Sequence, residues 1–215
     1  EGVPAMTAKN YPEVVAKYSE YLKLTNYEDE SRVFNCAFAA YNAKKYDDAI
    51  KFYDMAIQKG YKTDDAYVGK AMSLRSQDKA ADFTATVEAG LKANAQNANL
   101  EKLLYAYCMK KGQAAQKAGK TEEAEELFKD VLVVGNAKYK GNALYSLGVM
   151  FYNAGAKILA DANPIATSDP DKYAAEKKKA DAQMAKAKGY LEQAIALNAA
   201  DANSKKILDA INAAK

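Results

Sequence analysis

The side chains in this sequence that could do chemistry are two cysteines and three pairs of adjacent acidic residues. Histidine is absent, so the commonest general base and the commonest metal ligand are both missing. There is also no Cys-x-x-Cys motif and no glycine-rich phosphate-binding loop. The acidic pairs are Asp47-Asp48, Asp64-Asp65 and Glu122-Glu123, and each falls where a helix is expected to begin, where carboxylates stabilise the helix dipole. We therefore predict a protein that is not an enzyme and that has no metal site and no cofactor.

Cys36 and Cys108 fall on the core-facing side of two predicted helices. A cysteine in such a position usually behaves as a small buried hydrophobic residue, and we prefer this interpretation to a disulfide or a nucleophile. Two such cysteines do not indicate a redox compartment.

The cysteines and acidic pairs lie within a pattern of predicted helices that is clearest between Ser31 and Gly60. Apolar residues recur there at helical spacing on both sides of a tight turn at Lys44-Lys45. The apolar positions are Val33, Cys36, Ala37 and Ala40 before the turn, and Ala49, Ile50, Tyr53, Ala56 and Ile57 after it. Neither helix can bury its apolar stripe alone, so this pair of helices needs similar pairs beside it.

The same pattern recurs along the chain, with a spacing of about 34 residues where it is most regular. Small residues recur at corresponding positions of the first helices: Gly2, Ala37, Ala71, Gly112 and Gly148. On each second helix, two apolar positions recur four residues apart. These pairs are Val14 and Tyr18, Ala49 and Tyr53, Phe83 and Val87, Ala124 and Phe128, and Ala187 and Leu191.

This period and these small residues resemble the tetratricopeptide repeat (TPR) family. The resemblance implies that each small residue lies where the first helix of a unit crosses the second. The resemblance covers nearly the whole chain, although the third unit is degenerate and the proline that usually ends a unit is missing throughout. It implies an all-α fold, a right-handed α-α superhelix that forms a single solenoid over residues 1–215. The expected units are about 1–29, 30–62, 63–97, 98–136 and 137–200, followed by a C-terminal capping helix at 201–213.

Several helix boundaries follow from the sequence. The second helix of the first unit is expected at Tyr11–Leu24, and the first helix of the fourth unit at Leu100–Lys117, where Gly119 ends it. Thr63 and Thr121 are expected to cap the helices that follow them.

The fifth unit contains about 29 more residues than the period allows. Asp169-Pro170 indicates an N-cap followed by proline at the first helical position. We therefore predict an extended helical hairpin whose two arms overshoot the other helices by about two to three turns. Ile158, Leu159, Tyr173 and Met184 should pack the arms together, and Lys177-Lys178-Lys179 should face water.

In the TPR family, fixed positions on each first helix line a concave peptide-binding groove. The resemblance places the following residues there: Phe34, Phe38, Tyr41 and Asn42 of the second unit; Val68, Met72 and Arg75 of the third; Met109, Gln113 and Lys117 of the fourth; and Tyr145, Val149, Tyr152 and Asn153 of the fifth. Aromatic rings would supply contact area, and side-chain amides would bond a peptide backbone. The resemblance therefore implies a scaffold for a protein or peptide partner. Phe34 and Phe38 stand where TPR domains that clamp a chaperone's C-terminal carboxylate carry polar residues, so we exclude that class of partner.

Two alternatives stay open. The aromatic residues of the groove can instead pack within the chain, or the chain can be an assembly module that associates with itself. The second alternative is suggested by the first residues, because Glu1-Gly2 aligns with Cys36-Ala37, halfway along a first helix. We expect further residues upstream of Glu1, and an apolar repeat edge through Val3 and Met6.

The composition argues against some other partners. The net charge is only +3, acidic residues are interleaved with lysines, and Arg32 and Arg75 are the only arginines, so we predict no nucleic-acid partner. No run of residues is apolar and long enough for membrane insertion. The preference for lysine over arginine, with abundant tyrosine and asparagine, favours a bacterial source of low GC content and an exported protein of the cell envelope.

Overall fold

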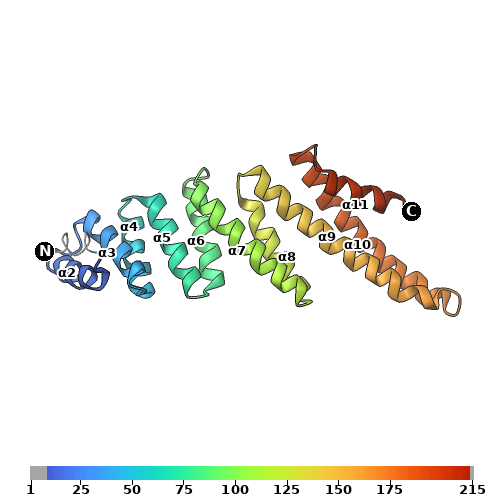
Figure 1. The fold of residues 1–215 in the computed structure, drawn as a ribbon, viewed down its shortest axis with the longest axis horizontal. Helices are drawn as coiled ribbons and strands as arrows, with labels where there is room; N and C mark the ends of the chain where they lie inside the picture. Colours follow the sequence, from blue (N-terminus) through green and yellow to red (C-terminus); the bar gives the residue numbers. More distant parts are fainter. Residues whose placement is uncertain (1–8, 214–215) are drawn as a thin grey trace. The chain divides into compact units, whose positions relative to one another are not determined.

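The structure, a computed structural model, describes residues 9–213. These residues form ten α-helices and two short 3₁₀ helices and contain no strand (Figure 1), so the all-α prediction is confirmed. The expectations for Gly2, Val3 and Met6 lie outside the described residues. The chain divides into two compact units, residues 1–102 and 103–215, and the division falls within one helix, α7 (Ala98–Lys117).

Unit 1 is a series of antiparallel helices in which each helix packs on the next one along the chain (Figure 1). Its helices are α2 (Tyr11–Leu24), α3 (Glu30–Asn42), α4 (Tyr46–Gln58), α5 (Thr63–Ser76), α6 (Ala80–Ala93) and the first turn of α7. The bounds of α2 are those expected from the sequence. The predicted turn at Lys44-Lys45 separates α3 from α4, and Lys44 adopts the left-handed conformation there, with a φ of 60°.

Small side chains allow the helices of unit 1 to approach one another closely. Cys36, Ala37 and Ala40 on α3 are all fully buried. Gly69 on α5 lies directly against the ring of Tyr53 on α4, because a Cβ at residue 69 would lie 2.2 Å from Cζ of that ring. The predicted role of Cys36 as a buried hydrophobic residue is confirmed, and its thiol is not in a disulfide.

Unit 2 contains the rest of α7 and the two longest helices of the described chain. It continues through α8 (Thr121–Asp130), the 3₁₀ helix η1 (Val131–Val133), α9 (Ala137–Ala162), the 3₁₀ helix η2 (Asn163–Ile165), α10 (Pro170–Leu197) and α11 (Ala202–Ala213). Its core is built around Phe128, Leu147 and Leu191, and Ile211 of α11 completes the core at the C-terminal end. The capping helix is therefore present, and it begins one residue later than expected, with Asp201 as its N-cap.

The two crossings predicted in unit 2 are confirmed by the positions of their glycines. A Cβ at Gly112 of α7 would lie 2.6 Å from the ring of Phe128 on α8, and a Cβ at Gly148 of α9 would lie 2.7 Å from the side chain of Leu191 on α10. Both partners are the bulky second-helix residues that the repeat pattern pairs with these glycines.

The α9–α10 hairpin is the extended hairpin predicted from the sequence (Figure 1). Its arms have 26 and 28 residues, against 13 each for α3 and α4. At 3.6 residues per turn, the overshoot is about four turns rather than two to three, because helix continues on both sides up to a short connection at residues 163–169. Asp169 caps α10 as expected, by accepting a hydrogen bond from the backbone N–H of Lys172 at 3.1 Å.

Close contact between the two arms depends on another glycine. A Cβ at Gly155 of α9 would lie 3.1 Å from both the backbone oxygen of Ala180 and the side chain of Met184 on α10. The side chains expected to join the arms, Ile158, Leu159, Tyr173 and Met184, are all half-buried, and the three lysines at 177–179 are exposed as expected.

The expected threonine caps are wrong at both positions. Thr63 and Thr121 are the first helical residues of α5 and α8, and the N-cap positions belong to Lys62 and Lys120, neither of which caps through its side chain. Lys62 has a φ of 43°, so the chain enters α5 directly from a left-handed turn. The acidic pairs do lie in the first turns of α4, α5 and α8, as expected for residues that stabilise helix dipoles.

We predict that the cap of α3 makes the stability of unit 1 sensitive to acid. Asp29 accepts a hydrogen bond from the backbone N–H of Arg32 at 2.9 Å and also pairs with the Arg32 guanidinium. This backbone hydrogen bond, helped by the guanidinium, holds the pKa of Asp29 below its ordinary value of 3.8. A lowered pKa in the folded state means that the charged cap contributes stability above that value and loses the contribution as the pH falls below it.

The test compares Asp29→Ala and Asp29→Asn by urea unfolding. At pH 7, Asp29→Ala should lower the free energy of unfolding by about 1 kcal/mol and Asp29→Asn by less, because the amide oxygen still accepts the hydrogen bond. The advantage of the wild-type chain over Asp29→Asn should shrink between about pH 5 and pH 3. An advantage that stays constant over this range would show that the carboxylate charge has no part in the cap.

Candidate binding surfaces

The fourteen residues predicted to line a groove all lie on the first helices of their pairs, and none of them is buried. Those of α3 and α5 belong to unit 1, and those of α7 and α9 belong to unit 2. Phe38, Asn42, Gln113, Lys117 and Asn153 are exposed, and the other nine are half-buried: Phe34, Tyr41, Val68, Met72, Arg75, Met109, Tyr145, Val149 and Tyr152. Each first helix therefore presents its predicted positions at least partly to solvent.

On α3, the two phenylalanines differ in their surroundings. Phe34 makes edge contacts with Tyr53 and Tyr61, with ring centroids 5.8 and 6.1 Å apart, and the Lys62 ammonium lies 5.1 Å above its ring. The Phe34 ring therefore packs mostly against other residues of unit 1, as expected if the aromatic residues of the groove pack within the chain. Phe38 has one edge contact, with Tyr11 at 6.1 Å, and remains 42% exposed.

The polar neighbours on α3 are partly engaged. Asn42 donates a hydrogen bond from Nδ2 to the backbone oxygen of Phe38 at 2.8 Å. Tyr41 packs on Tyr46 across the turn, with ring centroids 5.9 Å apart. Of the α3 positions, Phe38 is therefore the aromatic ring that offers the most accessible area to a partner.

In unit 2, the predicted positions of α9 form one helical stripe. Tyr145, Val149 and Tyr152 are spaced by four and three residues and so lie on one face. The same spacing continues into the extended arm through Ala156, Leu159 and Asn163. The stripe thus runs beyond the length of a standard repeat helix.

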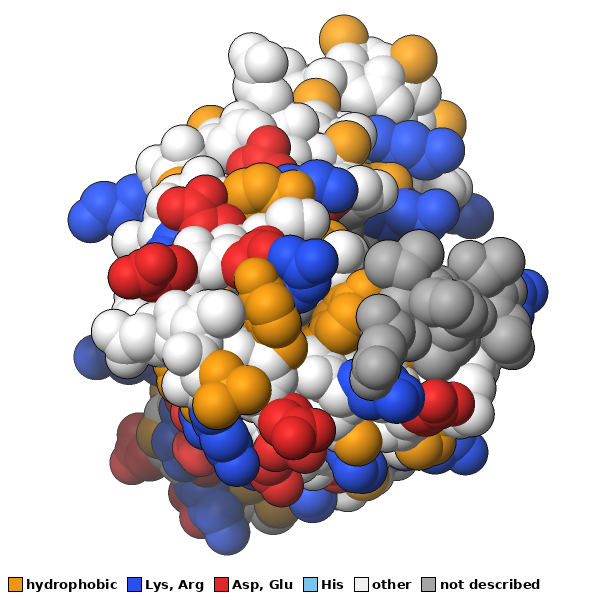
Figure 2. All heavy atoms as spheres, turned by 90° about the vertical axis from the view of Figure 1, so that its left-hand side faces the viewer, with side chains coloured by type: hydrophobic (Ala, Val, Ile, Leu, Met, Phe, Trp, Pro, Cys, Tyr) orange, Lys and Arg blue, Asp and Glu red, His pale blue; other side chains and the backbone are white. Residues whose placement is uncertain are grey.

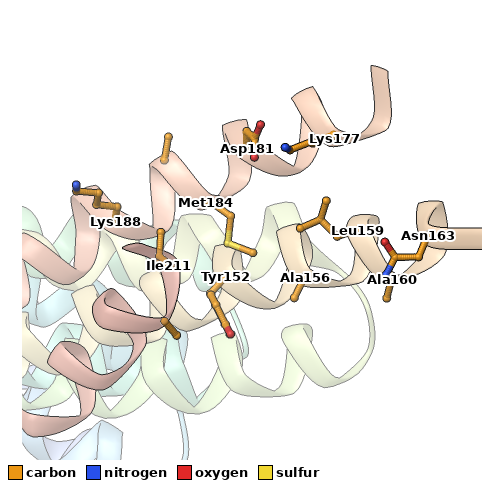
Figure 3. Close-up of a pocket in the computed structure, with 12 residues that line it drawn as sticks. Tyr152, Ala156, Leu159, Ala160, Asn163, Lys177, Asp181, Met184, Lys188 and Ile211 are labelled. Atoms are coloured by element: carbon orange, nitrogen blue, oxygen red, sulfur yellow. The ribbon is translucent and has the colours of Figure 1, made fainter. Parts of the chain in front are cut away.

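The extended part of the stripe forms one wall of a cavity of about 750 Å³ between α9, α10 and α11, which we call the hairpin pocket (Figure 3). The residues that line it are Tyr152, Ala156, Leu159 and Ala160 of α9, Asn163 of η2, Lys177, Asp181, Met184, Ala185 and Lys188 of α10, and Ala210 and Ile211 of α11. Tyr152 is the only one of the fourteen predicted positions among these lining residues. The remaining lining residues were not identified from the sequence.

The sequence indicates only part of the hairpin pocket. The continuation of the α9 stripe past Asn153 is visible in the sequence, and so are the alanines that leave space along it. The contribution of Ala210 and Ile211 was not visible, because it depends on where α11 packs on the hairpin.

The charged groups of the hairpin pocket are two lysines and one aspartate. Lys188 interacts with Glu192 at 3.7 Å and with Oδ1 of Asn212 at 3.5 Å, both longer than a direct charge-assisted hydrogen bond. Lys177 and Asp181 lie on the exposed side of α10, and Figure 3 shows them beside each other above Met184.

The described residues give little support for a reactive cysteine, a metal site or a membrane-spanning helix. Burial raises the pKa of the Cys36 thiol to about 11, so it is protonated and a poor nucleophile at neutral pH. No group of three or more potential metal ligands occurs within residues 9–213. None of the described helices combines the length and the apolar character that crossing a membrane requires.

The surface at the α2 end of unit 1 has mixed charge. On the face shown in Figure 2, lysine and arginine side chains are interspersed with aspartate and glutamate, and apolar side chains appear between them. Such a face lacks the single-sign patch that nucleic-acid binding surfaces carry.

Comparison with known proteins gives a strong similarity to a solved structure. No protein-family model matches the chain, and neither does any curated protein. Among solved structures, a TPR repeats protein from Bacteroides fragilis is 45% identical, with 100% of this chain and 96% of that chain covered and a TM-score of 0.93. The TPR domain of P58(IPK) is 13% identical, with 99% of this chain and 63% of that chain covered and a TM-score of 0.46. The Bacteroides protein supports the bacterial source that the composition favours.

Proposed function

Because the chain belongs to the TPR family, whose fold is a scaffold for protein–protein interaction, we propose that it binds a protein or peptide partner and catalyses no reaction. The partner binds to the exposed faces of the first helices, at the fourteen positions identified from the sequence. The observation that carries this proposal is the accessibility of those positions, above all Phe38 at 42% exposure.

The accessible rings suit such a role for a physical reason. An aromatic side chain with two rotatable bonds supplies a large contact area and loses little conformational entropy when it becomes buried. Phe38 and Tyr152 stand on helices whose opposite faces are held in the core of their unit, so the rings are presented by rigid elements. Neighbouring amides such as Asn153 can bond a partner's backbone.

The test begins with affinity capture from cell extract by the wild-type chain, followed by purification of each captured protein and measurement of its Kd. Phe38→Ala in unit 1 and Tyr152→Ala in unit 2 should each weaken binding of a true partner by about 2 kcal/mol, or about 30-fold in Kd. The loss comes from removing an anchor that becomes buried in the complex.

Tyr21→Ala is the matched control, because Tyr21 is also an exposed aromatic residue, at 39%, on a helix outside the predicted positions. Its Kd should equal that of the wild-type chain. An equal loss from Tyr21→Ala, or no loss from either test variant, would contradict the proposal. If the protein captured is the chain itself, the surface serves self-association.

A further inference from the structure

The hairpin pocket exists because α11 is much shorter than the hairpin on which it packs. Its 12 residues cover only part of the 26- and 28-residue arms. Ala210 and Ile211, near the last residue of α11, line one side of the cavity. The arms of the hairpin continue past Ile211 (Figure 3). The pocket thus lies where the short helix ends beside the two long ones, and of the fourteen predicted positions only Tyr152 lines it.

The lining and volume of the pocket suit a large apolar side chain together with part of the segment that carries it. Ala156 and Ala160 on α9 and Ala185 on α10 leave space along the arms, while Leu159 and Met184 form apolar walls. Ligand pockets that hold a few polar groups around an apolar floor usually have volumes of this order. The unbranched Met184 side chain can adjust to the shape of what enters.

The charge of the pocket favours an acidic partner. Its two lysines outnumber its one aspartate, and Lys177 begins a run of three exposed lysines. Unit 2 carries 17 lysines against 13 acidic residues, whereas unit 1 carries 14 basic and 15 acidic residues. The positive balance of the chain therefore lies in unit 2, the unit that contains this cavity.

We propose that the hairpin pocket binds a segment of a partner protein in which one bulky apolar side chain is flanked by acidic residues. The apolar side chain enters between Leu159, Met184 and Ile211, and the carboxylates meet Lys177 and Lys188. This inference rests on the proposed function in taking the occupant to be a protein segment. It assigns that segment to a second site, distinct from the positions on α3, α5 and α7.

The test uses a displayed library of random 12-residue peptides selected against the full chain, with Kd measured for synthetic copies of the enriched peptides. Enriched peptides should contain acidic residues next to leucine, isoleucine, methionine or phenylalanine. Their binding should weaken as the salt concentration rises, because exposed charge pairs are screened. Enrichment of basic peptides, or of none, would overturn the proposal.

Two matched pairs of variants locate the site on the pocket. Ala185→Trp fills the cavity, whereas Ala182→Trp adds the same ring at an exposed position of α10 that does not line it. Lys177→Glu reverses a charge at the pocket, whereas Lys178→Glu reverses its exposed neighbour. Ala185→Trp should weaken binding at least about tenfold, as expected for blocking a buried anchor, and the two controls should bind like the wild-type chain. Lys177→Glu should weaken binding several-fold and reduce the salt dependence.

The outcomes separate this inference from the proposed function. If the selected peptides lose affinity with Phe38→Ala but not with Ala185→Trp, they bind the first-helix positions, and the inference fails while the proposed function stands. If neither variant weakens them, both fail. If the chain self-associates, and Ala185→Trp abolishes this association while Ala182→Trp does not, the occupant of the pocket is a second copy of the chain. If the chain binds palmitate, and the two variants affect that binding in the same way, the occupant is a lipid. Either result overturns the proposal.

Discussion

Replacing Phe128 with alanine is expected to lower the free energy of unfolding by about 4 kcal/mol, as for other fully buried aromatic residues. Phe128 is 0% exposed and lies at the crossing of α7 and α8, with its ring against Gly112. The crossing is too close for the helices to move together and fill the space, so most of the cavity should remain. Urea unfolding followed by circular dichroism measures the loss.

The same contact predicts a strong coupling between Phe128 and Gly112. In the wild-type chain, Gly112→Ala should destabilise the protein, because the new Cβ would lie 2.6 Å from the ring. In the Phe128→Ala background there is no ring to displace, so Gly112→Ala should stabilise by up to about 1 kcal/mol through its higher helix propensity. A double-mutant cycle measures this change of sign. Additive effects of the two substitutions would show that the helices separate freely at this crossing.

In unit 1, Gly69→Ala is expected to lower the free energy of unfolding by about 2–3 kcal/mol, as overpacking of a core does. The added Cβ would lie 2.2 Å from the Tyr53 ring, which is 3% exposed and so has no room to swing into solvent. Either the ring or the α4–α5 spacing must change. The measurement is again the urea unfolding midpoint.

Gly189→Ala is the control for this prediction. Gly189 also lies inside a helix, α10, but a Cβ there meets nothing within 4 Å. The substitution should therefore raise the free energy of unfolding by about 0.5–1 kcal/mol, through reduced flexibility of the unfolded chain and higher helix propensity. If Gly69→Ala stabilised the chain as Gly189→Ala does, the close packing of α4 on α5 would be contradicted.

The repeat pattern was informative wherever a position is defined by close packing. Gly112 and Gly148 were predicted to lie at helix crossings because the family pattern places a small residue there, and both meet the bulky residue that the pattern paired with them. Tyr11–Leu24 was predicted correctly, with Pro12 in the first turn, where its missing N–H costs no helical hydrogen bond. Asp169 was predicted as a cap because the proline after it fixes the first helical residue.

The sequence was less informative where conformation depends on the backbone or on packing between distant segments. Threonine is a favourable cap in general, but the turn before α5 bends through a left-handed Lys62, which shifts Thr63 into the helix. No local pattern indicates that conformation for lysine. The hairpin pocket could not be predicted as a whole, because Ile211 reaches it only through the packing of α11 on the two arms. Phe34 is likewise less accessible than Phe38 because Tyr61 and Lys62, from the turn before α5, contact the Phe34 ring.

The packing of each helix on its neighbour along the chain also bears on how the protein acquires its structure. In unit 1, α2 contacts α3, α3 contacts α4, and the series continues to α6; in unit 2, α8 packs on α9, α9 on α10 and α10 on α11. Most native contacts therefore join residues close in sequence, which gives a low contact order and typically places folding in the microsecond-to-millisecond range. During translation, each helical pair can pack on the preceding pair as soon as it has left the ribosome, before the next pair has been synthesised. The long α9–α10 hairpin is the exception, since α9 must wait for most of α10 before its apolar face is covered.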